Sequence, residues 1–127
     1  MGHPRYGFSK KEKLTSKKTI EGLFKTGSSF RFKAFFIRHK ILEEEGCHQI
    51  LISVPKKNFK RAVDRNLIKR RIREAYRLNK ELIYKEGRNK FLSIAFVYLS
   101  KNILTFHEIQ DQLISALERL DNVVDGN

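Results

Sequence analysis

Phe91-Leu92-Ser93-Ile94-Ala95-Phe96-Val97-Tyr98 is a short, almost wholly apolar segment in an otherwise strongly charged chain. A strand that alternates apolar and polar side chains exposes one of its faces, whereas a strand that is apolar throughout has both faces covered. The segment is therefore predicted to be a central strand of a small sheet, with other elements on both sides of it.

Helical patterns lie on either side of this strand. After it, Thr105 and Glu108 form a capping box, which predicts that a helix begins there. That helix would bury Ile109, Leu113, Leu117 and Leu120. Before the strand, a helical pattern runs from about Ala62 to Tyr84, and Gly87 is placed to close it.

The N-terminal third of the chain predicts one helix and two strands. The helix can begin near Thr15 or Ser16 and end at Gly27, with Ile20, Leu23 and Phe24 on one face. Residues 28–42 predict one long or kinked strand, Glu43–Gly46 a hairpin turn, and Gln49–Val54 a second strand that Pro55 limits. The long strand would carry Phe30, Phe32 and Phe36 on one face and Phe35, Ile37 and Ile41 on the other.

These elements predict an α+β fold in which helices pack against a small mixed sheet of three or four strands. The order is α-β-β-α-β-α, with one more strand if residues 28–42 are split in two. A length of 127 residues fits one domain. We expect a basic flexible tail over residues 1–13, a single domain over residues 14–121 and a frayed C-terminus over residues 122–127.

The charge of the chain indicates a polyanionic partner. Lys and Arg number 27 against 14 Asp and Glu, which gives a net charge of +13 and a pI near 10.1. Such an excess destabilises a compact chain by self-repulsion unless a polyanion neutralises it. Nucleic acid is the leading candidate and an anionic membrane surface the second. The charge is also localised, since residues 54–77 hold ten Lys and Arg against two Asp and Glu.

Other features of the composition argue against several protein classes. Cys47 is the sole cysteine, which excludes an internal disulfide and suits a reducing cytoplasm. The longest unbroken apolar run, Ile94–Leu99, is too short to span a bilayer. The histidines lack metal-ligand spacing; they are His3, His39, His48 and His107. We therefore expect a soluble cytoplasmic protein with no metal site.

The strongest functional signal is the basic segment Arg65-Asn66-Leu67-Ile68-Lys69-Arg70-Arg71-Ile72-Arg73-Glu74-Ala75-Tyr76-Arg77. On a helix, an apolar stripe faces the core, formed by Ile68, Ile72, Ala75 and Leu82. Cations recur every fourth residue beside and opposite this stripe, namely Arg65, Lys69, Arg73 and Arg77, with Asn66 and Arg70 next to them. The row is either a solvated face or a nucleic-acid-binding face, and the scarcity of acidic residues favours binding.

The same residues resemble the bacterial ribonuclease P protein family. In that family a strand ending in Val-Ser-Lys-Lys leads into Ala-Val-x-Arg-Asn-Arg-x-Lys-Arg-x-x-Arg-Glu. The matching residues here are Val54-Pro55-Lys56-Lys57, Ala62-Val63-Asp64-Arg65-Asn66, Lys69-Arg70 and Arg73-Glu74-Ala75. The similarity covers residues 8 to about 120. Pro55 replaces a Ser, Leu67 replaces an Arg, and Phe96 stands where an Arg is common, so neither Leu67 nor Phe96 is an expected contact.

The resemblance implies a ribosomal protein S5 domain 2-like fold with a β-α-β crossover of the unusual left hand. It also implies that this chain is the protein subunit of ribonuclease P. In that endoribonuclease the RNA subunit removes the 5′ leader of precursor tRNA. Mg²⁺ would be bound mainly by the RNA subunit and the substrate, and the protein alone would not be catalytic. The partners would be the ribonuclease P RNA and precursor tRNA, with no membrane and no obligate protein partner.

Two RNA-binding surfaces follow from the resemblance. Contacts to the RNA subunit are expected from Lys56, Lys57, Arg65, Asn66, Lys69, Arg70, Arg73 and Arg77. The leader is expected to lie against Ile20, Phe24, Phe36 and Arg38, although the three apolar residues of this set could equally be ordinary core.

Three other classes stay open on the residues alone. A ribosomal protein could use the same basic helix on a different RNA. A stand-alone endoribonuclease would need a convergent set of acid and base residues, and the sequence shows no such set. A strand-rich first half argues against a helix-turn-helix DNA-binding regulator.

Overall fold

The computed structural model describes residues 10–42, 46–85 and 90–126. Within these residues four strands form one sheet: β1 (Ser28–Phe32), β2 (Phe35–Leu42), β3 (Gln49–Ser53) and β4 (Phe91–Tyr98). The helices are α1 (Lys17–Thr26), α2 (Ala62–Asn79) and α3 (Phe106–Gly126), and the 3₁₀ turns are η1 (Lys10–Glu12) and η2 (Lys80–Leu82). The predicted α+β class is confirmed, with the first strand in two pieces.

β4 lies in the interior of the sheet, as its sequence predicts. The strand order is β1-β2-β4-β3, in which β2 is antiparallel and β3 is parallel to β4. α2 connects the parallel pair β3 and β4, so the β-α-β crossover is confirmed. The hand of that crossover stays a prediction.

The expected hairpin between the first two predicted strands, residues 28–42 and 49–54, is wrong. β2 and β3 are not neighbours, because β4 lies between them. β4 is apolar on both faces and therefore gains the most burial in the interior of the sheet. Pro55 has no N–H for a ladder and follows β3, which suits a strand at the edge. Residues 43–45 of the expected turn lie outside the described residues.

Residues 28–42 form a hairpin rather than one long strand. β1 and β2 are antiparallel with Phe32 opposite Phe35, which leaves Lys33 and Ala34 as a two-residue turn. Lys33 has a φ of 51°, and a left-handed residue in such a turn matches the twist of the paired strands.

This turn changes which side chains share a face of the sheet. Residues opposite each other in a strand pair point to the same side, so Phe30 lies with its partner Ile37, and Phe32 with Phe35. Phe36 points to the other side. The prediction that Phe30, Phe32 and Phe36 share a face is therefore wrong, because it assumed an unbroken alternation through the turn.

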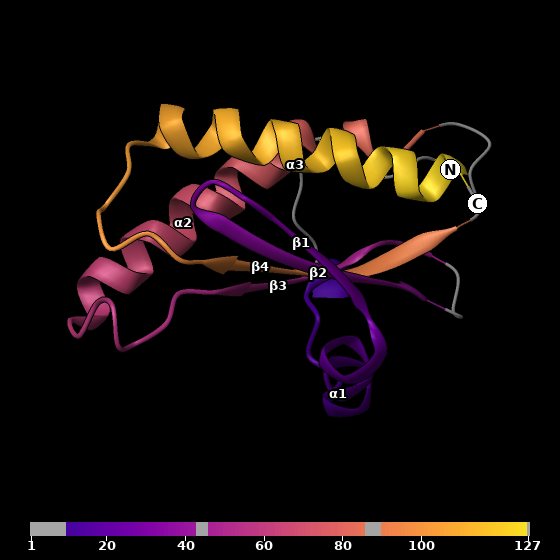
Figure 1. Ribbon diagram of the computed structural model, residues 1–127, viewed down its shortest axis with the longest axis horizontal. Coiled ribbons are helices and arrows are strands. Elements are labelled where there is room, and N and C mark those ends of the chain that lie inside the picture. The colour runs from indigo at the N-terminus through magenta and orange to yellow at the C-terminus, as the bar shows by residue number, and fades with distance from the viewer. Residues whose placement is uncertain (1–9, 43–45, 86–89, 127) are drawn as a thin grey trace.

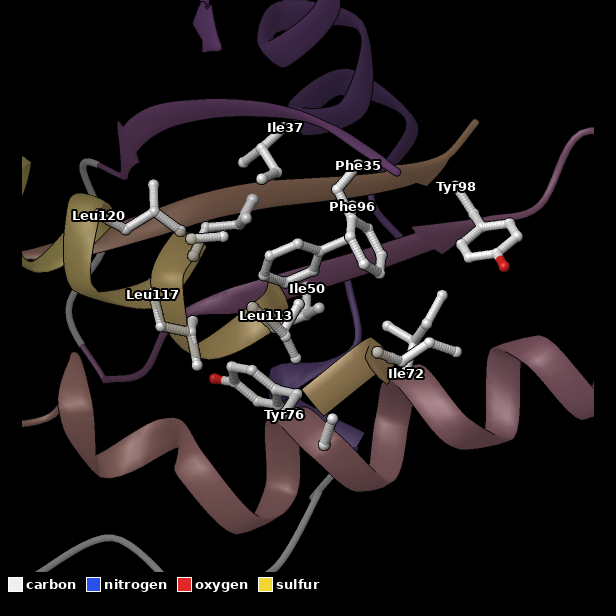
Figure 2. Packing of buried hydrophobic residues seen from close by; sticks show 14 of the residues in the cluster. Phe35, Ile37, Ile50, Ile72, Tyr76, Phe96, Tyr98, Leu113, Leu117 and Leu120 are labelled. Atoms are coloured by element: carbon white, nitrogen blue, oxygen red, sulfur yellow. The ribbon is translucent and has the colours of Figure 1, made fainter. Parts of the chain in front are cut away.

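The sheet is covered on both faces, by α2 and α3 on one side and by α1 on the other (Figure 1). The larger core lies under α2 and α3, and Figure 2 shows part of it around Phe96, Tyr76 and Leu113. A smaller cluster beneath α1 consists of Leu14, Leu23 and Ala95, with Ile20 and Leu51 packed against it. The four residues that α3 was predicted to bury are all 0% exposed: Ile109, Leu113, Leu117 and Leu120.

Capping residues set both ends of α1 and the start of α3 where the sequence predicts them. The Ser16 side chain accepts a backbone N–H of the first turn of α1 at 3.3 Å. Thr105 and Glu108 accept each other's backbone N–H groups at 2.9 and 3.1 Å, which confirms the capping box. Gly27 ends α1, and a Cβ atom there would lie 2.4 Å from the Leu23 carbonyl oxygen, so the close backbone approach requires glycine.

The folded domain extends beyond both predicted ends. Residues 10–13, expected in the flexible tail, include η1, and Glu12 is only 2% exposed. Residues 122–126, expected to be frayed, continue α3, where Val124 is 4% exposed and joins the core. Residues 1–9 of the expected tail lie outside the described residues.

A buried polar network fastens η1 to the end of α2. The Glu12 carboxylate lies 2.6 Å from the Lys80 ammonium, and their side chains are 3% and 2% exposed. The other carboxylate oxygen accepts the hydroxyls of Tyr76 at 3.1 Å and Tyr84 at 2.9 Å. Burial is the main cause that raises the pKa of both tyrosines, which keeps their hydroxyls protonated as donors.

Candidate nucleic-acid interface

α2 turns its cationic row outward because its apolar stripe is fixed in the core. Ile68, Ile72 and Ala75 are 0% exposed, as predicted. Leu82, the fourth predicted member of the stripe, lies in η2 and packs on the edge of the same core. Since 3.6 residues make one turn, fixing the stripe also fixes where residues 66, 69, 70 and 73 point.

Two details of this helix differ from the prediction. Tyr76 was not predicted as a core residue, yet it is 0% exposed, and its hydroxyl bonds Glu12. The α-helix also ends at Asn79 and continues as η2, rather than running to Tyr84. Gly87, the predicted end, lies outside the described residues.

Four of the predicted contact residues on α2 are unpartnered. Asn66, Arg70 and Arg73 are exposed and Lys69 is half-buried. Within residues 10–42, 46–85 and 90–126, no hydrogen bond or ion pair engages their side chains. The charges of Lys69, Arg70 and Arg73 are therefore free to be neutralised by an external anion, and the Asn66 amide is free to form hydrogen bonds. Lys69 and Arg73 lie about one helical turn apart.

Arg65 and Arg77, in contrast, have partners within the protein. Arg65 donates to the carbonyl oxygens of Phe59 at 2.7 Å and Lys60 at 2.9 Å, in the loop before α2. Arg77 donates to Glu74 at 3.0 Å, and this hydrogen bond lowers the pKa of the Glu74 carboxyl. Guanidinium groups have five N–H donors, so both can still bind a phosphate, but their charge is partly committed.

Lys56 and Lys57 occupy the corner of a turn between β3 and α2. The Asn58 N–H donates to the Pro55 carbonyl at 3.2 Å, which closes this turn. Both lysines are exposed and have no hydrogen bond or ion pair with the rest of the described chain. The predicted contacts thus run along α2 and the turn that precedes it; we call these eight residues the cationic face.

The second predicted surface lies on the sheet face that α1 covers. Arg38 points to this face, since it donates to carbonyl oxygens of α1 and of Gly27, and Phe36 shares its side of β2. Both are half-buried. From α1, Ile20 is half-buried and Phe24 is 42% exposed. The structure therefore brings all four predicted residues to one side of the sheet, and Phe24 is not a core residue.

Arg38 also has a structural task. Its guanidinium donates to the carbonyl oxygens of Leu23 at 3.2 Å and Gly27 at 3.0 Å. A cation is favourable at the C-terminal end of a helix, where carbonyl groups lack partners. The same guanidinium lies 5.8 Å from the centre of the Phe24 ring, which holds this exposed aromatic side chain beside the sheet.

The aromatic surface on this side is smaller than predicted. Phe30 lies on the opposite face, where Arg119 of α3 stacks on its ring at 4.3 Å. Phe32 shares that face with Phe35. Among the described residues, the partly open rings on the α1 side are therefore those of Phe24 and Phe36.

His48 is a structural residue of the core. Its Nδ1 accepts the Leu92 N–H at 2.9 Å, and its Nε2 lies 2.8 Å from the Ile83 carbonyl oxygen, so it is a buried residue with both nitrogens bonded. Among the described residues, no group of three or more His, Cys, Asp and Glu could hold a metal ion. In that same part of the chain, no helix is long and apolar enough to cross a membrane.

The fold and the cationic face define a small, basic α+β protein of the nucleic-acid-binding class. The model of the ribonuclease P family matches residues 8–121. A ribonuclease P protein component of Porphyromonas gingivalis is 34% identical over 121 residues, which span 92% of this chain and 88% of the relative.

Solved structures agree with this match. The RNase P protein from Thermotoga maritima has a TM-score of 0.70 at 25% identity, covering 85% of this chain and 96% of its own. The Staphylococcus aureus RNase P protein has a TM-score of 0.66 at 25% identity, covering 86% and 94%. The chain belongs to the ribonuclease P protein family. It is a subunit of the ribonucleoprotein that cleaves precursor tRNA, and it acts with an RNA partner in tRNA 5′ processing.

Proposed function

We propose that the cationic face binds the RNA subunit of ribonuclease P. The observation that carries this proposal is the row of Asn66, Lys69, Arg70 and Arg73, which has no partner in the described part of the chain. Like charges four residues apart cost a helix a few tenths of a kcal/mol each. RNA phosphates would replace that repulsion by attraction and would release their counterions.

We also propose that the sheet face beside α1 binds the single-stranded 5′ leader of precursor tRNA. Phe24 and Phe36 offer partly open rings, on which bases stack at about 1–3 kcal/mol each with little sequence preference. Arg38 lies beside Phe24 and adds positive charge, while Ile20 extends the apolar surface. A leader of varied sequence needs that tolerance.

Replacing Phe36 by Ala is expected to weaken binding of precursor tRNA to the reconstituted holoenzyme roughly tenfold, because one stacked base loses about 1.4 kcal/mol. Binding of mature tRNA, which has no leader, is expected to stay unchanged. Equilibrium binding of both tRNAs and the melting temperature, measured on one preparation of the variant, check this expectation.

Phe32→Ala is the matched control, since Phe32 is also half-buried but lies on the other face of the sheet. It is expected to leave the ratio of precursor to mature affinity unchanged. If Phe36→Ala instead lowered the melting temperature and weakened both tRNAs by the same factor, Phe36 would be a core residue and not part of a leader site.

We further propose that the Mg²⁺ needed for cleavage is held mainly by the RNA subunit and the substrate, and that the complex acts in the cytoplasm. Phosphate oxygens are the hard ligands that hydrated Mg²⁺ prefers. The free Cys47 thiol is in keeping with a reducing compartment. In this scheme the protein contributes RNA binding and leaves the hydrolytic step to the RNA.

A further inference from the structure

We propose that a depression between the turn before α2 and the loop before α3 binds a phosphate of an RNA backbone, with Lys101 as a further contact residue. The depression has a volume of about 450 Å³ and is lined by Lys57, Asn58 and Lys101. This proposal rests on the proposed binding of RNA by the cationic face and extends that face onto a second loop.

The sheet topology places the two loops together. β3 and β4 are adjacent and parallel, so their carboxyl ends lie at the same edge of the sheet. The chain leaves that edge twice, once into the loop before α2 and once into the loop before α3 (Figure 1). Lys57 follows β3 and Lys101 follows β4, which brings two lysines distant in sequence to one place.

The loop that carries Lys101 is held in place by Tyr98, which is 0% exposed. The Tyr98 hydroxyl donates to the Asn102 carbonyl and accepts the Leu104 N–H at 3.1 Å. Within the loop, the Ser100 hydroxyl oxygen accepts the Asn102 N–H at 3.0 Å. Lys101 is therefore an exposed residue on a backbone that these hydrogen bonds hold in place. Binding of an anion then costs less conformational entropy than it would on a flexible loop.

Tyr98 also packs against the segment that carries Lys57 and Asn58, which lines the other side of the depression. The ring of Phe59, which is 8% exposed, lies 6.1 Å from the ring of Tyr98. Arg65 of α2 donates to the Phe59 carbonyl oxygen at 2.7 Å. The segment that follows Lys57 is thereby fixed both to α2 and to the base of the loop that carries Lys101.

The chemistry of the lining suits a phosphate. The side chains of Lys57, Asn58 and Lys101 have no hydrogen bond or ion pair with the described residues. Two ammonium groups and one amide can together donate several hydrogen bonds to phosphate oxygens. None of the three lining residues is acidic. A bound phosphate would relieve the repulsion between the two lysines and release counterions from the RNA.

The test replaces Lys101 by Ala in the full-length protein and measures its affinity for the cognate RNA subunit over a range of salt concentrations. Losing one phosphate contact flattens the salt dependence by about 0.7–0.9 units of slope, which is about five- to eightfold in affinity at 0.1 M salt. Lys11→Ala is the matched control: it removes an equal charge from an exposed lysine of η1, which packs at the amino end of β3. It is expected to leave the slope unchanged.

A second arm measures precursor and mature tRNA binding by holoenzyme reconstituted with Lys101→Ala. A loss against the RNA subunit assigns the phosphate to that RNA, and a loss confined to precursor tRNA assigns it to the leader; either result supports the site. Unchanged affinity in both arms, or an equal loss in Lys11→Ala, overturns it.

The double variant Lys69→Ala/Arg73→Ala, measured in parallel, separates two kinds of failure. If it weakens RNA binding while Lys101→Ala does not, the depression is wrong and the cationic face stands. If neither variant weakens RNA binding, the proposed function of the cationic face fails as well.

Discussion

Replacing Glu12 by Ala is expected to lower the free energy of unfolding by about 3–5 kcal/mol, which is a large share of the stability of a single domain. The substitution removes the carboxylate from a Lys80 ammonium whose side chain is 2% exposed. It also removes the acceptor of the Tyr76 and Tyr84 hydroxyls. Denaturant unfolding of the variant and the wild type at neutral pH measures the difference.

Glu21→Ala is the control for this experiment, because it removes an exposed carboxylate from α1. A surface change of that kind is expected to stay within about 0.5 kcal/mol. Equal stabilities of Glu12→Ala and Glu21→Ala would mean that η1 is not part of the cooperative domain, contrary to the packing described above.

Replacing Lys69 and Arg73 together by Ala is expected to weaken binding of the RNA subunit by about 25- to 60-fold at 0.1 M salt and to flatten the salt slope by about 1.4–1.8 units. Both side chains lack a partner among the described residues, so their removal costs the fold little and the interface much. Equilibrium titrations at four or more salt concentrations give both quantities, and circular dichroism checks that the variant is folded.

A double variant of equal charge change, Lys11→Ala/Lys25→Ala, controls for the overall positive field. Both of these lysines are exposed and lie outside α2 and the turn before it. If the two double variants lost equal affinity and equal slope, binding would reflect net charge alone, and the row on α2 would be a solvated face.

The elements that the sequence predicts well are those set by neighbouring residues. β4 has the predicted bounds because eight consecutive side chains determine its burial on both faces. The capping box of Thr105 and Glu108 is local, and so is the apolar stripe of α2. The cationic row follows from that stripe, since fixing one side of a helix fixes the other.

Local sequence signals of this kind do not predict which distant segments pair with each other. The turn at Lys33 and Ala34 has none of the Gly, Asn or Asp residues that usually mark a hairpin, so residues 28–42 resembled one strand. The position of β4 between β2 and β3 depends on competition for the interior of the sheet. The Glu12–Lys80 ion pair joins two segments that are far apart in the sequence, and no periodic pattern of side chains links them.

The candidate site likewise has features that local sequence patterns predict and features that depend on contacts between distant segments. Sequence periodicity placed Lys69 and Arg73 on one row, but the carbonyl partners of Arg65 and Arg38 depend on where loops and helix ends meet in space. Lys101 lies in a short loop outside every periodic segment, and only the parallel pairing of β3 and β4 brings it beside Lys57.

Processing of precursor tRNA by purified components tests the central claim most directly. The protein alone is expected to leave the precursor intact, whereas the protein with its cognate RNA subunit, in Mg²⁺ on the order of a few millimolar, is expected to release the 5′ leader and yield the mature 5′ end. The RNA subunit alone at the same Mg²⁺ concentration shows what the protein adds. Robust cleavage by protein from which all RNA has been digested would contradict a division of labour in which the protein binds RNA and the RNA performs the hydrolysis.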